Sequence, residues 1–146
     1  GVMVTMSAIT ITRASWQTDE QTIKSIRMPV FVEEQNVPFD IDFDHNDASA
    51  IHWLARNEQG RAIGTARMLS DGHFGRMAVL KESRNKGIGR QIMQAALEYA
   101  MHAGMEKVYL NAQLHARAFY ERLGFSPYGD VFLEANIEHI GMARRP

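Results

Sequence analysis

The segment from Arg84 to Gly89, Arg-Asn-Lys-Gly-Ile-Gly, is the strongest local signal for chemistry in this sequence. It lies between a predicted strand and a long predicted helix. Its two glycines let the backbone approach a ligand closely and turn successive N–H groups toward it. The start of the helix adds roughly half a positive charge, and Arg84, Lys86 and Arg90 add full charges around it. Together these residues predict a binding site for a pyrophosphate group.

Other phosphate-binding motifs fit this segment poorly. A dinucleotide-binding fingerprint needs a third small residue at position 92, where Ile92 stands. A P-loop needs Gly-Lys-Ser or Gly-Lys-Thr after a longer loop, and the segment lacks it. Gly-x-Gly between a strand and a helix is also compatible with a simple tight turn, so the segment has to be weighed together with a second motif.

The second motif follows the long helix. Asn111-Ala112-Gln113 ends a predicted strand in side-chain amides, and residues 116–125, Ala-Arg-Ala-Phe-Tyr-Glu-Arg-Leu-Gly-Phe, predict a short helix that presents Tyr120. With Arg-x-x-Gly-x-Gly upstream of it, this pattern resembles the GNAT superfamily of acyl-CoA-dependent N-acetyltransferases. The resemblance covers nearly the whole chain, from Ile9 to about Met142.

Four further segments are similar to the small bacterial ElaA-like branch of that superfamily. They are Val32-Glu33-Glu34-Gln35, the acidic loop after it, Leu110-Asn111-Ala112-Gln113 and His139-Ile140-x-Met142. The resemblance implies an α/β fold of GNAT type, with a mixed, mostly antiparallel central sheet flanked by helices. It also implies a V-shaped split between two parallel strands, here residues 76–80 and 105–111.

The same resemblance implies how acetyl-CoA, the acetyl donor, would lie in this split. Backbone groups of Met77, Ala78 and Val79 would pair with the pantetheine arm like an added strand, and an N–H of that strand would stabilise the thioester oxygen. The pyrophosphate would lie against Arg84 and against the amides of Asn85, Lys86, Gly87, Ile88, Gly89 and Arg90. Asn111, Arg117 and Tyr120 would approach the donor from the second motif.

Tyr120 is the general acid that we expect for the departing CoA thiolate. A thiol titrates near pH 8.5 and a tyrosine near pH 10, so the tyrosine is protonated at neutral pH and can donate. The alternative is a tyrosine whose ring simply packs under the short helix.

The acceptor amine needs a base. A primary amine with a pKa near 10.4 must lose a proton, which at pH 7 costs about 4 to 5 kcal/mol. Through the resemblance, Glu34 is the candidate base and Glu33 a candidate acceptor contact, although either carboxylate could simply be solvated. His52, on an alternating strand, could serve as the base instead, and both His52 and His139, on the last strand, are candidates for contact with the acceptor. A lone strand histidine such as His52 is more often structural.

Charge is uneven along the chain. Residues 33–47 contain six acids and no Lys or Arg, whereas residues 76–90 contain five basic residues and one acid. The first segment favours a cationic acceptor, such as a polyamine, an amino sugar, a small amine or a lysine side chain, and the second favours an anion. The alternative is two solvated stretches of surface.

His45 lies among Asp42, Asp44 and Asp47, but their spacing matches neither a calcium loop nor a zinc helix, so we expect no metal and a solvated loop.

The elements that must position these residues follow the order β-α-β-β-β-α-β-α-β-β. A strand over residues 8–13 precedes a helix that a capping box at residues 18–21 would open and that Pro29 must kink or interrupt. A polar loop over 36–49 leads to three antiparallel strands. The expected ranges are 50–57, 61–69 and 73–80 for these strands, 88–103 for the long helix, 105–111 for the next strand, 114–123 for the short helix, and 125–142 for two final strands around residues 134–136.

Length and composition fit one domain over residues 8–146, with residues 1–7 as an N-terminal extension. The chain has 146 residues, 45% of them hydrophobic, a net charge of −1 and no cysteine. The lack of cysteine excludes a disulfide scaffold, a thiolate metal site and a cysteine nucleophile. The charge and the short apolar runs predict no nucleic-acid partner and no membrane span, and they are typical of a soluble, cytoplasmic domain. A homodimer through the last two strands is possible.

The leading hypothesis is therefore an acetyl-CoA-dependent N-acetyltransferase. Because no cysteine can form an acyl-enzyme, the amine would attack the thioester directly in a ternary complex. The alternative from another class is a non-catalytic acyl-CoA-binding sensor or interaction module. A nucleotide-binding domain is a third hypothesis, and Ile92 disfavours it.

Overall fold

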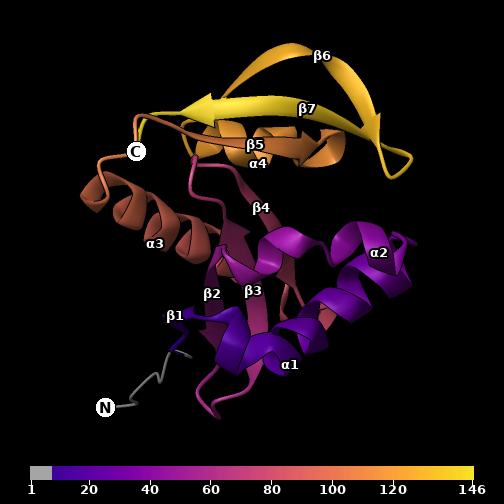
Figure 1. Cartoon of the computed structure of the whole chain (residues 1–146), viewed down its shortest axis with the longest axis vertical. Coiled ribbons are helices and arrows are strands. Elements are labelled where there is room, and N and C mark those ends of the chain that lie inside the picture. Colours follow the sequence, from indigo (N-terminus) through magenta and orange to yellow (C-terminus); the bar gives the residue numbers. More distant parts are fainter. Residues whose placement is uncertain (1–7) are drawn as a thin grey trace, which may run out of the picture.

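Two antiparallel sheets meet along one edge in the computed structural model, which describes residues 8–146 (Figure 1). The expected extension over residues 1–7 lies outside the described residues. The first sheet has the order β1-β2-β3-β4 and the second the order β5-β7-β6. The strands of the first sheet are β1 (Thr10–Ala14), β2 (Ile51–Arg56), β3 (Ala62–Met68) and β4 (Phe74–Val79). Those of the second are β5 (Val108–Gln113), β6 (Ser126–Glu134) and β7 (Ile137–Arg144).

Helix α1 (Trp16–Arg27) begins two residues before the expected capping box, which starts at residue 18. Its N-cap is Ser15, whose Oγ accepts a hydrogen bond from the Thr18 N–H at 3.3 Å. The Asp19 carboxylate reaches back to the Ser15 N–H at 3.0 Å. The N-terminal capping contacts are therefore present, but they join Ser15 to Thr18 and Asp19, because Ser15 has the extended backbone that an N-cap requires.

Pro29 changes the helix without ending it. After α1 the chain continues as the π-helical segment η1 (Met28–Glu34), since a proline has no N–H to donate within a regular helix. The loop expected over residues 36–49 contains two short helical turns, α2 (Phe39–Asp42) and η2 (His45–Ala48). In Figure 1, α1, η1 and α2 run along one side of the first sheet.

Strand β4 contains a bulge at the position that matters most for the site. Thr65 of β3 pairs with Ala78, whereas Arg67 pairs with Gly75, so Arg76 and Met77 together oppose one residue of β3. Arg76 has a φ of +51°, which few residues other than glycine adopt. A bulge leaves one residue without a ladder partner and turns its backbone out of the sheet.

Helix α3 (Ile88–His102) forms where the long helix was expected, over residues 88–103. Gly87 precedes the helix with a φ of +75°, and Gly104 follows it with a φ of +73°. The apolar face of the helix, with Ile88, Ile92, Ala96 and Ala100, is buried against the first sheet. Gly64 of β3 allows this approach, because a Cβ there would lie 3.1 Å from the Ile88 side chain.

After β5 the chain forms a short turn, η4 (Leu114–Ala116), and helix α4 (Arg117–Arg122) before the final hairpin. The turn between β6 and β7 lies where it was expected, with Ala135 and Asn136 both at positive φ, as in a tight type I′ turn.

Strands β4 and β5 belong to different sheets and share a single parallel bridge, between His73 and Tyr109. No helix within residues 8–146 is long and apolar enough to span a bilayer.

Candidate active site

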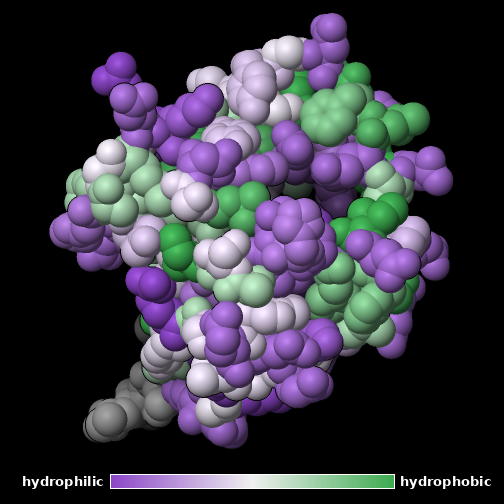
Figure 2. Space-filling view, in the orientation of Figure 1, coloured by the Kyte–Doolittle hydropathy of each residue, from purple (hydrophilic) through white to green (hydrophobic). Residues whose placement is uncertain are grey.

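A cavity of about 410 Å³ opens where the two sheets meet. Four parts of the chain form its walls: the segment from η1 to α2, strand β4, the end of β5 with α4, and the turn between β6 and β7. Figure 2 shows the surface hollowed between the second sheet above and the η1–α2 segment below. A volume of this size is within the range of small-molecule sites.

The wall formed by β4 offers backbone groups. Met77, Ala78 and Val79, the residues expected to pair with the pantetheine arm, all line the cavity. Beyond the bridge at His73, β4 has no ladder partner on its β5 side among the described residues. An extended ligand can therefore hydrogen-bond to this edge as an additional strand would.

The predicted pyrophosphate loop lies directly after β4 and a 3₁₀ turn, η3 (Lys81–Ser83). Asn85 and Gly87 both have positive φ, at 65° and 75°, and α3 has no side-chain cap at its N-terminus. Successive N–H groups in such a conformation form an anion-binding concavity, to which the helix dipole contributes. The loop adjoins the cavity through Arg84, which lines it. The local structure therefore fits the binding of a phosphate group.

Arg84 is held between η1 and β4. Its two terminal nitrogens donate to both carboxylate oxygens of Glu34, at 3.0 and 2.8 Å, and its Nε donates to the Val79 carbonyl at 3.0 Å. Glu34, the expected base, therefore lies in a bidentate ion pair and outside the cavity lining. Glu33, next to it, is exposed and also lies outside the lining. This geometry favours a role in positioning Arg84 over proton abstraction by Glu34.

Tyr120 of α4 and Asn111 of β5 border the cavity opposite β4. The Tyr120 ring makes edge contacts with Phe119 and Phe125, at centroid distances of 5.0 and 5.9 Å. Burial raises the pKa of Tyr120 above its ordinary value, because the phenolate would be poorly solvated there. Tyr120 therefore both packs against aromatic neighbours and lines the cavity, and its hydroxyl is protonated at neutral pH.

Two other residues of the second motif, Gln113 and Arg117, are bonded within the protein. Gln113, at the end of β5, donates from Nε2 to Gln35 Oε1 at 2.8 Å, so a hydrogen bond joins the two sides of the cavity. Arg117, expected beside the donor, instead forms an exposed pair with Glu121 at 3.0 Å and lies outside the lining.

His139 lines the cavity from β7, as expected, and is only 7% exposed. Its Nδ1 lies 2.6 Å from the Ile137 carbonyl, and its Nε2 lies 3.5 Å from Glu134 Oε2. Glu134, at the end of β6, lines the cavity too and was not singled out from the sequence.

Residues 29–146 match the family described as the Acetyltransferase (GNAT) domain. The chain belongs to the GNAT acetyltransferase family. It is 38% identical over 128 residues to Protein ElaA of Escherichia coli K12, over 82% of each chain. A solved acyl-CoA N-acyltransferase from Pseudomonas aeruginosa is 31% identical with a TM-score of 0.83, over 94% of this chain and 99% of that one. The solved E. coli ElaA is 32% identical with a TM-score of 0.83, over 93% and 99%.

These comparisons confirm the predicted superfamily, its ElaA-like branch and the GNAT fold. They show an acyltransferase that uses a CoA-derived acyl donor. The pyrophosphate loop, the edge of β4 and Tyr120 are thus parts of a GNAT domain, and the cavity between them is its candidate active site.

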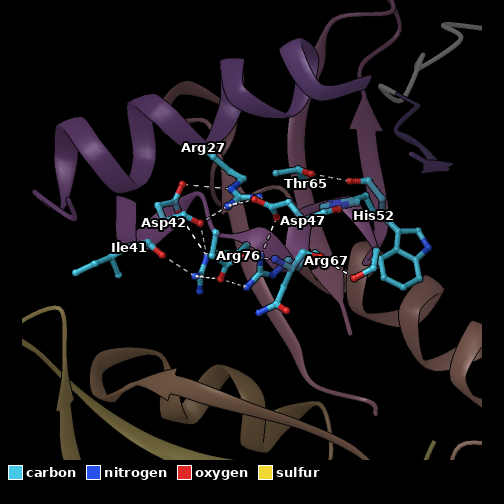
Figure 3. Close-up of polar contacts among 12 residues, drawn as sticks. Arg27, Ile41, Asp42, Asp47, His52, Thr65, Arg67 and Arg76 are labelled. Carbon is cyan, nitrogen blue, oxygen red and sulfur yellow. Dashed lines mark hydrogen bonds and ion pairs between the residues drawn. The ribbon is translucent and has the colours of Figure 1, made fainter. Parts of the chain in front are cut away.

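In this GNAT domain the acidic loop is not the solvated loop that we expected. Figure 3 shows Asp42, Asp47 and three arginines pointing toward one another. Arg27 contacts Asp47 at 2.8 Å and Asp42 at 3.3 Å, and Arg67 contacts Asp47 at 2.8 Å. Arg67 also contacts Asp44 at 2.7 Å, and Arg76, from the β4 bulge, contacts Asp42 and Asp44, each at 3.3 Å. We call these six residues the ion network.

The ion network forms part of the cavity wall, because Asp42 and Arg76 both line the cavity. Arg76 also donates to the backbone carbonyls of Ile41 and Asp42, each at 3.0 Å, and so ties the bulge to α2. Burial opposes ionisation of Asp44, but hydrogen bonds from Arg67 outweigh it and lower the pKa of Asp44 to about 2. Charged residues inside otherwise apolar segments, such as Arg27 after Ile26, were the signal that could have revealed the network.

His52, a candidate contact for the acceptor, is not part of the cavity wall. It is 0% exposed, lies outside the cavity lining, and its Nε2 donates to the Asp47 carbonyl at 2.9 Å. Its ring stacks on Trp16 at a centroid distance of 5.6 Å. Burial lowers the pKa of His52, so the ring is neutral at pH 7. The geometry therefore supports a structural role for His52 rather than contact with an acceptor.

Proposed function

We propose that this protein transfers an acetyl group from acetyl-CoA to a primary amine, by direct attack of the amine in a ternary complex. One observation carries the proposal: a single cavity is bordered on one side by the free edge of bulged β4 and on the other by Tyr120. These are a hydrogen-bonding wall for a thioester arm and a proton donor for its leaving group. A binding module would need the first and not the second.

In this proposal the donor occupies a V-shaped split between β4 and β5. The pantetheine arm pairs with Met77, Ala78 and Val79, and the backbone amides from Asn85 to Arg90 hold the pyrophosphate. The bulge at Arg76 frees a backbone N–H to stabilise the thioester oxygen as negative charge develops. Asn111 contacts the donor from β5. Arg117 would have to leave its ion pair with Glu121 in order to contact acetyl-CoA.

Tyr120 donates its phenolic proton to the departing sulfur. The raised pKa keeps the hydroxyl protonated, so it is available at every turnover under neutral conditions. The amine, once deprotonated, needs no covalent intermediate, and the sequence offers no cysteine to form one.

The acceptor side carries less free negative charge than the composition of residues 33–47 suggested. Asp42, Asp44 and Asp47 are each matched by arginines of the ion network. Glu134 remains as an acidic side chain on the cavity wall, with 47% of its side chain exposed. A single carboxylate suits one ammonium group, so polyamines have no special advantage over small amines, amino sugars or a lysine side chain as acceptors.

Release of CoA thiol from acetyl-CoA in the presence of a mixed amine panel tests this function. Because the chain has no cysteine, every thiol that appears is CoA. We expect thiol release that depends on the amine, together with an acetylated product of matching mass. Binding of acetyl-CoA without thiol release from any amine would favour the alternative, an acyl-CoA-binding sensor. Propionyl- and butyryl-CoA in the same assay measure the preference for the acyl group.

A further inference from the structure

His139 lies on the face of the second sheet that borders the cavity. In the β5–β7 ladder His139 pairs with Gln113, and Asn111 pairs with Gly141. Alternate residues of a strand point to the same face, so Ile137 and His139 share a face with Asn111 and Gln113. All four of these residues line the cavity. The imidazole therefore lies beside the side-chain amides that border the proposed donor.

The hydrogen bonds of His139 determine which of its nitrogens can accept a proton. The Ile137 carbonyl can only accept, so the Nδ1 atom 2.6 Å away must carry the hydrogen. In the neutral ring the lone pair is then on Nε2. Because Nδ1 already donates to the backbone, the ring is held in one tautomer, with Nε2 available as a base.

Glu134 lies beside that free nitrogen. Its Oε2 is 3.5 Å from His139 Nε2, and it has no Lys or Arg partner among the described residues. The imidazolium form of His139 could therefore donate one N–H to the Ile137 carbonyl and the other to this carboxylate. Since half of the Glu134 side chain is exposed, it also connects the buried ring with solvent.

The other charged or titratable groups that line the cavity are engaged, neutral or exposed. Arg84 is paired with Glu34, Tyr120 is protonated, and His115 of η4 is exposed and has no carboxylate at ion-pair distance among the described residues. Arg76 and Asp42 belong to the ion network. His73, at the start of β4, stacks on Tyr109 at 4.6 Å, and burial lowers its pKa, so it carries no charge at pH 7. Glu34, the base expected from the sequence, is paired with Arg84. His139 with Glu134 is the pair that retains both a lone pair and a route for the proton.

We propose that His139 is the general base of this enzyme and that Glu134 carries the proton from it to solvent. This inference rests on the proposed N-acetyltransferase function. An N–H bond of the acceptor ammonium breaks and an Nε2–H bond forms on His139, which leaves a neutral amine to attack the thioester. The proton then passes from Nε2 to the Glu134 carboxylate and from there to water, and His139 returns to its neutral form.

The test compares two acceptors that differ in basicity. Wild type and His139→Asn, in which the amide can still donate to the Ile137 carbonyl, are assayed at pH 7 with an alkylamine that the wild type acetylates and with its alkoxyamine analogue. The alkylamine is almost wholly protonated at that pH, whereas the alkoxyamine is not. We expect His139→Asn to lose about 100-fold in kcat/KM for the alkylamine and less than about threefold for the alkoxyamine.

Glu134→Gln provides a second variant at an exposed position, where folding is not at risk. Without the carboxylate, the proton on Nε2 loses its acceptor, so we expect Glu134→Gln to lose about tenfold in kcat/KM for the alkylamine and less than about threefold for the alkoxyamine. His102→Asn, an exposed histidine near the end of α3, is the matched control and should behave like wild type. The acetyl-CoA dissociation constant should be the same for all of these proteins.

The outcomes separate this inference from the function on which it rests. If wild type releases no CoA with any amine, the proposed function fails and the inference fails with it. If wild type is active but His139→Asn loses equally with both amines, or loses nothing, the inference alone is overturned. If Glu134→Gln loses nothing with the alkylamine, or loses equally with both amines, the role of Glu134 is overturned.

Discussion

Single residues in this protein combine packing with chemistry, and Tyr120 is the most direct case. Its ring contacts Phe119 and Phe125, while its position on the cavity wall suits a proton donor. We predict that Tyr120→Phe lowers kcat about 10- to 1000-fold, because the thiolate must then leave unprotonated. The packing is preserved, so the dissociation constant for acetyl-CoA, measured by calorimetry, should not change. An unchanged kcat would contradict the assignment.

His52 shows the opposite outcome, a titratable residue whose role is structural. Burial lowers its pKa below the unfolded value of about 6.5. At a pH just below 6.5, His52 is therefore protonated in the unfolded chain and neutral in the folded chain. The free energy of unfolding consequently decreases as the pH falls below about 6.5. The Nδ1 atom of His52 is buried without a partner in the described structure, which leaves nothing to stabilise a second proton.

His52→Gln isolates this effect, because the glutamine amide can still reach the Asp47 carbonyl. Urea denaturation at pH 7, 6 and 5 measures the difference in stability between wild type and variant. We predict that wild type loses more stability than His52→Gln on acidification, by at most about 1.4 kcal/mol per pH unit. His73 also has a pKa lowered by burial, but it is present in both proteins and cancels in the difference. Parallel curves would show that His52 does not titrate differently on folding.

At the scale of elements, the pair of Glu34 with Arg84 connects η1 to the loop between β4 and α3. If Glu34 positions Arg84 and abstracts no proton, Glu34→Gln should leave kcat within about threefold of wild type, against the 100-fold or greater loss expected of a general base. Glu33→Gln, on the same segment, is the control. Steady-state kinetics with saturating acetyl-CoA decide the matter. A 100-fold loss in kcat with an unchanged dissociation constant would restore Glu34 as the base.

The ion network joins elements that are far apart in the chain, namely α1, β3, β4 and the α2–η2 segment. Asp47 accepts from both Arg27 and Arg67 at 2.8 Å and is 1% exposed. We predict that Asp47→Asn lowers the free energy of unfolding by about 3–5 kcal/mol, because it leaves buried positive charge uncompensated.

Asp40→Asn is the matched control for that measurement, since Asp40 is exposed in the same acidic segment. It should change the free energy of unfolding by less than about 0.5 kcal/mol. Urea denaturation of the two variants, followed by circular dichroism, provides the comparison. If Asp47→Asn were as stable as Asp40→Asn, the ion network would contribute nothing to the fold.

For the molecule as a whole, what the sequence could predict was mainly local. The face of α3 follows from the spacing of Ile88 and Ile92, and the final turn follows from residues 134–136. The ion network could not be predicted in this way, because Arg67 lies 23 residues from Asp44 and 20 from Asp47 in the chain. Composition alone made the acidic stretch look solvated. The pairing of Glu34 with Arg84, 50 residues away, was missed for the same reason.

The two sheets are joined at β4 and β5 by one bridge, so the donor itself should contribute to holding the molecule together. A ligand at 100 times its dissociation constant adds about 2.7 kcal/mol to the free energy of unfolding. We predict that acetyl-CoA and CoA each raise Tm by several degrees, whereas NAD and ATP do not, because Ile92 blocks the dinucleotide fingerprint and the P-loop is missing. Differential scanning fluorimetry measures this. A shift with NAD or ATP alone would mean that the loop from Arg84 to Gly89 serves nucleotides, and the assignment of the donor site would have to be abandoned.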